Sequence, residues 1–157
     1  MRELNPGFQC PRSGIVPCRS VNASKRVVSI DLKSEPGKLA FDELVVAADV
    51  LLESYRPGVI ERLGFGNKRL RELNPGLIHC ALSGYGQTGP FRLRVGHDIN
   101  YVAMTGSLNV TATAERPVMV FPPIADYGGA LQAATEILGA LIGREHGGGG
   151  FGAFLAG

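Results

Sequence analysis

The sequence predicts an α/β domain in which helices flank a parallel sheet. Three short apolar segments, Val27–Leu32, Asp49–Ser54 and Leu77–Ser83, have the length and composition of buried strands. Helical patterns separate them, and this alternation is typical of a parallel sheet. Hydrophobic residues make up 45% and charged residues 19% of the 157 residues. The chain can therefore form a sizeable core.

The helices follow from apolar spacing and from their end signals. Ser34-Glu35-Pro36-Gly37 predicts a helix start, because proline is tolerated in a first turn. Two short helices are expected at 57–63 and 68–73, with Asn67 capping the second. Another is expected to start at Asp98 and reach about Thr105, before an extended run at 117–123.

The longest helical pattern runs from Asp126 to about His146, and Gly147–Gly150 ends it. Its apolar residues recur at helical spacing and are expected to form its buried face. They are Leu131, Ala134, Ile137, Leu138, Leu141 and Ile142.

Composition divides the chain into three parts. Residues 1–20 contain three prolines, two glycines and two cysteines without periodicity and read as an irregular leader. Residues 21–146 carry the α/β pattern. Residues 147–157 read as a glycine-rich tail, in which 151–157 are expected to form no further element.

Several classes of function are disfavoured. A net charge of +2 gives no concentrated basic face for nucleic acid. No apolar segment is long enough to span a membrane, and no signal peptide is evident. The three cysteines form no CxxC pair, so neither a disulfide framework nor a zinc site is expected, and no other metal site is predicted. We expect a cytoplasmic protein.

Two unusual loops follow predicted strands. Ligands of parallel sheets bind beyond the carboxyl ends of the strands. Glu53–Gly58 contains Arg56, and Arg62 follows nearby; arginine side chains suit phosphate groups. Ser83–Pro90 contains three glycines, which indicate either a flexible turn or a backbone that approaches a ligand closely.

The titratable candidates are His97 and Asp126. His97 lies between a glycine and an aspartate at a loop-to-helix junction, where it could titrate and still be oriented. Asp126 begins the longest helical pattern, where a plain N-cap is the alternative to a catalytic role. Asp98, near the start of the preceding predicted helix, could likewise be a plain N-cap. The residues alone leave these choices open.

Taken together, several motifs from about Lys25 to His146 resemble the class III coenzyme A-transferase (CaiB/BaiF) superfamily. Within it, the last motif resembles the α-methylacyl-CoA racemase branch, because transferase branches typically carry an aromatic residue in place of His97. The motifs are Lys25–Lys33, Glu53-Ser54-Tyr55-Arg56-Pro57-Gly58-Val59, Glu61-Arg62-Leu63-Gly64, Asn74-Pro75, Ser83-Gly84-Tyr85-Gly86-Gln87-Thr88-Gly89-Pro90 and Gly96-His97-Asp98-Ile99-Asn100-Tyr101.

The resemblance implies a Rossmann-like large domain and an acyl-CoA enzyme with His97 and Asp126 as its catalytic pair. The racemase branch interconverts 2-methylacyl-CoA epimers by α-proton transfer. The transferase alternative moves CoA between carboxylic acids through an acyl-aspartate at Asp126. The CoA and substrate contacts implied are Arg56, Arg62, Gly84, Tyr85, Gly86, Gly96, Asp98 and Tyr101.

The implied partner is an acyl-CoA thioester, with no nucleic acid, no membrane and no cofactor beyond the CoA of the substrate. Family members are interlocked homodimers. The chain lacks the family's opening strand and helix and stops after the long helix, so the domain is expected to be truncated at both ends. A third hypothesis is therefore a fragment that only binds CoA or is inactive, for which the dimer is not expected.

Overall fold

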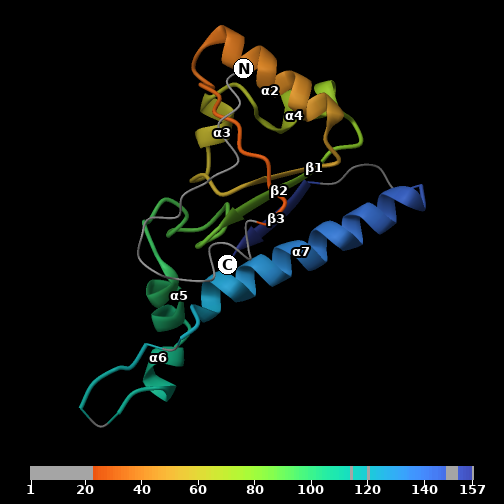
Figure 1. Cartoon of the computed structure of the whole chain (residues 1–157). Coiled ribbons are helices and arrows are strands. Elements are labelled where there is room, and N and C mark those ends of the chain that lie inside the picture. The colour runs from red at the N-terminus through yellow and green to blue at the C-terminus, as the bar shows by residue number, and fades with distance from the viewer. Residues whose placement is uncertain (1–22, 114, 120, 148–151, 157) are drawn as a thin grey trace. The chain divides into compact units, whose positions relative to one another are not determined.

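The computed structural model describes residues 23–113, 115–119, 121–147 and 152–156. The chain divides into two compact units, Met1–Phe41 and Asp42–Gly157. The predicted leader at 1–20 lies outside the described residues. In chain order (Figure 1) the elements are α2 (Glu35–Ala47), β1 (Val50–Glu53), α3 (Val59–Arg62), α4 (Asn67–Leu73), β2 (Ile78–Ser83), α5 (Asp98–Met104), α6 (Ser107–Val110), α7 (Ile124–Glu145) and β3 (Gly152–Ala156).

The start of α2 is the best-defined feature of the first unit. The Oγ atom of Ser34 accepts a hydrogen bond from the N–H of Gly37 at 3.1 Å, which caps the helix. A side chain at Gly37 would collide with the carbonyl oxygen of Asp31, so the turn requires glycine. The predicted helix start is confirmed. The predicted strand Val27–Leu32 is wrong: only Val28 makes a single bridge, and apolar residues form a strand only where a partner offers a ladder.

The second unit contains a three-stranded parallel sheet in the order β1-β2-β3. The middle strand, β2, contains the fully buried residues Ile78 and Cys80. The Cys80 thiol is free, and burial raises its pKa. The predicted parallel sheet is confirmed, together with its strands at β1 and β2.

The third strand corrects the prediction for the end of the chain. Gly147 leaves α7 with φ +89°, and Gly152–Ala156 then pairs with β2 from His79 to Ser83. Five residues are an ordinary strand length. The expectation that 151–157 form no element is therefore wrong. The pairing edge on β2 is formed by residues about 70 positions earlier, and sequence periodicity does not reveal such a partner.

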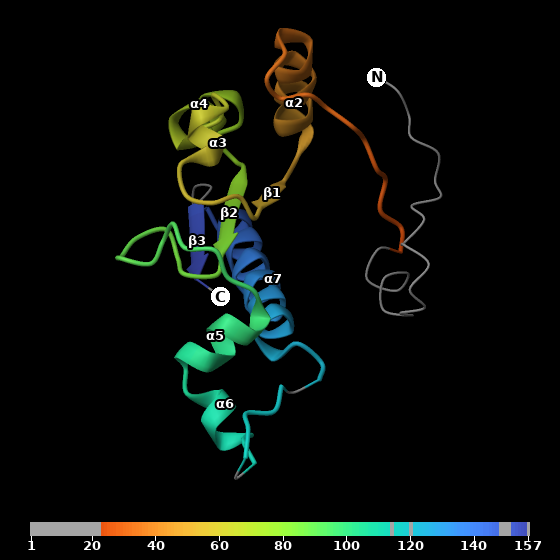
Figure 2. The same ribbon diagram turned by 90° about the vertical axis from the view of Figure 1, so that its left-hand side faces the viewer.

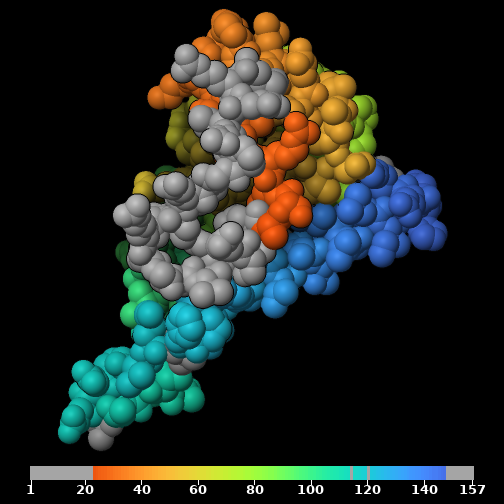
Figure 3. Space-filling view, in the orientation of Figure 1, coloured from red at the N-terminus to blue at the C-terminus, as the bar shows by residue number. Residues whose placement is uncertain are grey.

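Helix α7 contacts β2, β3 and α5 (Figures 1 and 2). Its predicted buried face is only partly correct: Ile137 and Leu141 are half-buried, whereas Leu131, Leu138 and Ile142 are 70%, 59% and 58% exposed. The helix buries Ala133, whose small side chain allows close packing. Figure 3 shows α7 (blue) in space-filling form.

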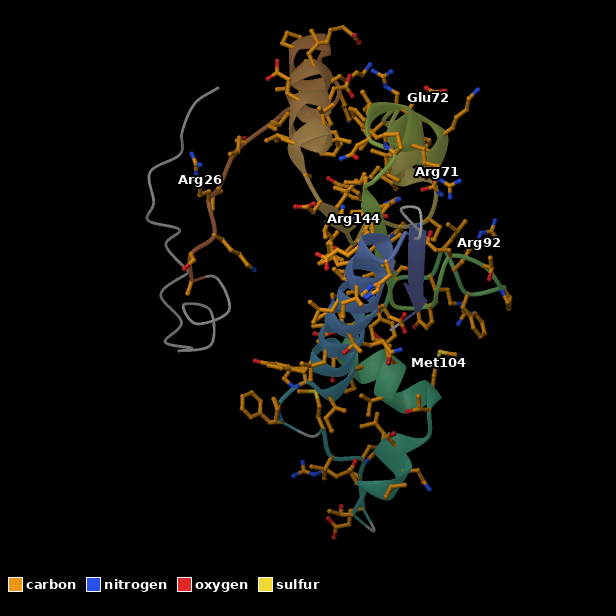
Figure 4. The ribbon with its side chains drawn as sticks, turned by 90° about the vertical axis from the view of Figure 1, so that its right-hand side faces the viewer. Arg26, Arg71, Glu72, Arg92, Met104 and Arg144 are labelled. Carbon is orange, nitrogen blue, oxygen red and sulfur yellow. The ribbon has the colours of Figure 1, made fainter. Side chains whose placement is uncertain are left out.

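Two polar side chains hold the turn before β2. The Nδ2 group of Asn74 donates to the carbonyl oxygens of Val45 (3.0 Å) and Ala48 (2.8 Å), and its Oδ1 accepts from the N–H of Gly76 (3.1 Å). Arg144, near the end of α7 (Figure 4), donates to the carbonyl oxygen of Gly76 at 2.8 Å. Its other Nη group contacts Asp49 at 2.7 Å. The C-terminal ends of α2 and α7 are thereby joined to the sheet.

A buried histidine lies in β2. His79 is 5% exposed, and its Nδ1 is 2.8 Å from Oδ1 of Asn67, so the ring donates this hydrogen bond. Asn67 was predicted to cap α4; the N-cap is Gly66, and the Asn67 side chain turns to the histidine instead. The Nε2 atom lies 3.9 Å from Oε1 of Glu53. Burial lowers the pKa of His79 and raises the pKa of Glu53.

Among the described residues, no helix is long and apolar enough to cross a membrane.

Replacing Asn74 with alanine should lower the free energy of unfolding by about 2 to 3 kcal/mol, since three hydrogen bonds of roughly 1 kcal/mol each are lost. Urea denaturation followed by circular dichroism measures this change. The matched control is Asn109→Ala on the exposed α6, which should change the stability by less than about 0.5 kcal/mol. Equal effects of the two substitutions would contradict the role of Asn74.

His79 should make the protein less stable in acid. Its folded pKa lies below the ordinary value of 6.5, so the unfolded chain binds the proton more tightly. This contribution to stability is complete above pH 6.5 and is lost as the pH falls toward the lower folded pKa. Glu53 acts in the opposite sense, because its raised pKa favours the folded state below pH 4.5.

Thermal unfolding of the wild type and of His79→Gln, compared between pH 8 and pH 5, separates the two contributions, because both proteins retain Glu53. The wild type should lose more stability than His79→Gln as the pH falls through this interval. A constant difference across the interval would rule out titration of His79.

Candidate functional site

A cavity of about 420 Å³ lies at the carboxyl ends of β1 and β2. The loops after both strands, the start of α7 and one side chain of α5 line it, as expected for the binding edge of a parallel sheet. Its lining residues are Ser54, Tyr55, Arg56, Pro57, Leu82, Ser83, Gly84, Tyr85, Arg92, Arg94, Val95, Gly96, Tyr101, Ala125, Asp126 and Gly129.

The lining is strongly cationic. Arg56, Arg92 and Arg94 contribute three guanidinium groups, against the single carboxylate of Asp126. In the described part of the chain, none of the three forms an ion pair with an acidic side chain. Arg94 is held over the ring of Phe91, 4.5 Å from its centre. The cavity can therefore accept an anionic ligand without breaking existing ion pairs.

Two tyrosines form one wall. The rings of Tyr85 and Tyr101 meet edge to face, with centres 5.1 Å apart. Tyr101 lies so close to the backbone that a side chain at Gly84 would collide with its ring, and one at Gly96 would come within 2.7 Å. Burial, together with Tyr85 and the charge of Asp126, raises the pKa of Tyr101. Its phenol thus stays protonated near neutral pH and can donate a hydrogen bond.

A second hollow, of about 560 Å³, adjoins the first and shares Tyr85 and Tyr101 with it. Val102, Met104 and Ile124 give it a more apolar lining. The two tyrosines therefore stand between a cationic space and an apolar one.

Asp126 is the third residue of α7, and its carboxylate is exposed beside the cavity. The alternative that Asp126 is the N-cap of this helix is wrong, because α7 begins at Ile124 and its N-cap is Pro123. Asp98 supplies the missing acceptor: its Oδ1 accepts hydrogen bonds from the N–H groups of Ala125 (2.7 Å) and Asp126 (3.0 Å).

The structure brings together most of the predicted site residues, but not all of them. Those that line the cavity are Arg56, Gly84, Tyr85, Gly96, Tyr101 and Asp126. Four predicted residues are absent from the lining. His97 is exposed at the N-cap of α5, where its N–H donates to Oδ1 of Asn100 at 2.9 Å. Asp98 is 8% exposed behind the cavity, Arg62 lies exposed on α3, and Gly86 is buried in its loop.

Arg92 and Arg94 line the cavity but are not among the site residues expected from the sequence. Figure 4 shows Arg92 on the loop between β2 and α5. The available signal was position, since both follow a glycine-rich loop at the same sheet edge as Arg56. Among the described residues, no group of three or more His, Cys, Asp or Glu is arranged to hold a metal ion.

Comparisons with known proteins agree with this architecture. A sequence model described as CoA-transferase family III matches residues 1–153. A CaiB/baiF CoA-transferase family protein from Caenorhabditis elegans, ZK892.4, is 43% identical over 135 residues, which are 82% of this chain and 39% of that protein. The crystal structure of Rv3272 from Mycobacterium tuberculosis has a TM-score of 0.78 at 35% identity, covering 85% of this chain and 37% of that one.

Relatives with different activities match the same region. Human alpha-methylacyl-CoA racemase is 42% identical over 122 residues, 76% of this chain and 32% of the racemase. Formyl-CoA:oxalate CoA-transferase from Streptomyces coelicolor is 34% identical over 127 residues, 80% of this chain and 31% of the transferase. The chain thus spans less than two fifths of the length of these curated relatives.

Gly84→Ala should destabilise the protein by about 1 to 3 kcal/mol, because the new methyl group must displace the ring of Tyr101. Urea denaturation measures the effect, and tyrosine fluorescence reports on the ring. The matched control is Gly139→Ala in α7, where a Cβ would meet nothing within 4 Å. That variant should be more stable than wild type by about 0.5 to 1 kcal/mol. An unchanged stability of Gly84→Ala would contradict the close approach of Tyr101.

Proposed function

The chain belongs to the CoA-transferase family III, and on that premise we propose that its second unit binds an acyl-CoA thioester and transfers the α-proton of the acyl group. The observation that carries the proposal is the cavity lined by Asp126 and by three guanidinium groups, which form no ion pair with an acidic side chain among the described residues. The proposed substrate is a 2-methylacyl-CoA, and the proposed outcome is exchange of its epimers.

The charge of the cavity supports the CoA part of the proposal. CoA carries several phosphate charges, and arginine side chains bind phosphate through paired hydrogen bonds. Arg56 follows β1, whereas Arg92 and Arg94 follow β2, so cationic groups reach the cavity from two loops. Arg62, expected to contact CoA, lies outside the lining and is not needed for this part of the proposal.

The adjoining apolar hollow supports the acyl part. A thioester carbonyl between the two spaces would leave the CoA phosphates beside the arginines and the acyl chain beside Val102, Met104 and Ile124. The α-carbon would then lie near Tyr101 and Asp126. The protonated phenol of Tyr101 is a candidate donor to the enolate oxygen, a contact worth about 3 kcal/mol in other enzymes.

The proposed mechanism uses two groups on opposite faces of the α-carbon. The thioester makes the α-proton removable. In one direction His97 takes this proton from one face while Asp126, starting in its carboxylic acid form, gives its own proton to the other face; in the reverse direction the carboxylate of Asp126 is the base and the protonated His97 is the acid. A positioned acid or base contributes roughly 10²- to 10⁴-fold to the rate. The choice of proton transfer over acyl transfer rests on His97, which the resemblance associates with racemases, and on the racemase relative.

The second candidate is a CoA-transferase in which Asp126 attacks the thioester carbonyl. The exposed carboxylate of Asp126 at the cavity and the transferase relative favour it. Its intermediate is an anhydride between the acyl group and Asp126, with CoA as the leaving thiolate. Hydroxylamine converts such an anhydride into a hydroxamate at Asp126, which mass spectrometry detects. A hydroxamate found in the wild type but not in Asp126→Asn would support the CoA-transferase and contradict the proton-transfer proposal.

His97→Ala should abolish α-proton exchange of a 2-methylacyl-CoA in deuterated water, whereas the dissociation constant for acetyl-CoA should stay within about threefold of the wild type, because this side chain makes no phosphate contact. Nuclear magnetic resonance measures the exchange, and calorimetric titration measures the binding. His146→Ala is the matched control, since His146 is exposed at the end of α7.

Unchanged exchange in His97→Ala would contradict the proton-transfer proposal. Binding of acetyl-CoA without exchange in the wild type would support a fragment that only binds CoA. If the wild-type chain neither binds acetyl-CoA nor catalyses α-proton exchange or acyl transfer, both the racemase and the transferase proposals are refuted for this chain on its own.

A further inference from the structure

The side chain of Asp98 in α5 is hydrogen-bonded to the first turn of α7. Its Oδ1 accepts hydrogen bonds from the N–H groups of Ala125 and Asp126 at 2.7 and 3.0 Å, across 27 and 28 residues of sequence. Asp98 is 8% exposed and is absent from the residues that line the arginine-rich cavity. The carboxylate therefore lies outside the cavity lining and is hydrogen-bonded to the backbone of α7.

The first turn of α7 needs this acceptor. The first N–H groups of a helix have no partner within the helix, and usually the residue just before the helix supplies one. That residue is Pro123, whose side chain has no acceptor. A carboxylate at a helix N-terminus is also favoured by the helix dipole. Asp98, which belongs to α5, thus accepts the hydrogen bonds that an N-cap side chain next to the helix usually accepts.

We propose that Asp98 is a positioning residue for Asp126. This inference rests on the proposed function, because it assigns Asp98 to the placement of the carboxyl group that reacts there. The backbone N–H of Asp126 is bonded directly to Asp98, so the hydrogen bond fixes the point from which the reacting side chain extends. The side chain of Asp98 is absent from the residues that line the cavity, so the role proposed for its carboxylate is exerted through the backbone of α7.

The same contact links the two reacting groups. His97 precedes Asp98, and the N–H of His97 is held by Oδ1 of Asn100 in the first turn of α5. One short segment therefore carries His97 and also holds the first turn of α7. Misplacement of a reacting group by about 1 Å costs on the order of 100-fold in rate, so this anchoring has a large expected effect.

The test compares Asp98→Ala, Asp98→Asn and Arg144→Ala in the full chain. Asparagine keeps an acceptor oxygen for both N–H groups, whereas alanine removes it. Arg144→Ala is the matched control, because it removes an anchor of α7 at the opposite end, away from the cavity. The measurements are α-proton exchange at varied acyl-CoA concentration and hydrogen exchange at the amides of Ala125 and Asp126.

Asp98→Ala should lower kcat for α-proton exchange about 100-fold and leave KM within about threefold, because the reacting group moves while the ligand contacts stay. Amide exchange at Ala125 and Asp126 should accelerate roughly 10- to 100-fold, as expected on loss of a hydrogen bond to a charged group. Asp98→Asn should keep most of the wild-type kcat and most of the wild-type protection of these two amides. Arg144→Ala should lower the melting temperature but leave kcat and these two amides unchanged.

Two results would overturn the inference: a kcat for Asp98→Ala equal to that of Arg144→Ala, or amides of Ala125 and Asp126 that exchange at the wild-type rate in Asp98→Ala. A wild type without α-proton exchange would instead refute the proposed function. In that case the amide exchange still decides whether Asp98 places Asp126.

Discussion

The pairing of β2 with a parallel strand on each side is the constraint on which the second unit depends. Because β2 is flanked by β1 and β3 and covered by α7, its side chains are buried from Ile78 to Ala81. A strand held on both edges ends at a defined point, and beyond Ser83 the chain enters the loop that forms the cavity wall. Arg56, Gly84 and Tyr85 are neighbours because β1 and β2 are parallel and end at the same edge.

Most of the fold of this unit could be predicted because its signals are local. Apolar runs located β1 and β2, and capping and helical spacing located α2, α5 and α7 to within a few residues. Features that depend on distant partners could not be predicted. Periodicity showed that α7 has an apolar side but not that Ala133 would face the sheet and Leu131 the solvent. Likewise, Asn67 resembled a cap because nothing in its neighbourhood reveals His79.

The residues of the candidate site likewise fall into those with local sequence signals, which could be predicted, and those that depend on distant partners, which could not. Six of the ten predicted residues line the cavity, because loop position after a parallel strand is readable from sequence. Arg92 and Arg94 were missed because they carry no motif, only a place in a loop whose path the aromatic contacts of Tyr85 and Phe91 direct. The contact of Asp98 with α7 was unreadable because it spans 27 residues and replaces a cap that Pro123 cannot provide.

The hydrogen bonds from α7 to Asp98 have a consequence for how this chain can diverge. They join α5 to the first turn of α7, which are the two ends of the segment that contains α6. We therefore expect insertions, deletions and substitutions around α6 to displace Asp126 little. This segment also carries lining residues of the apolar hollow, such as Ser107 and Thr111. Evolution can thus reshape the apolar space while the residues at 97, 98 and 126 stay fixed.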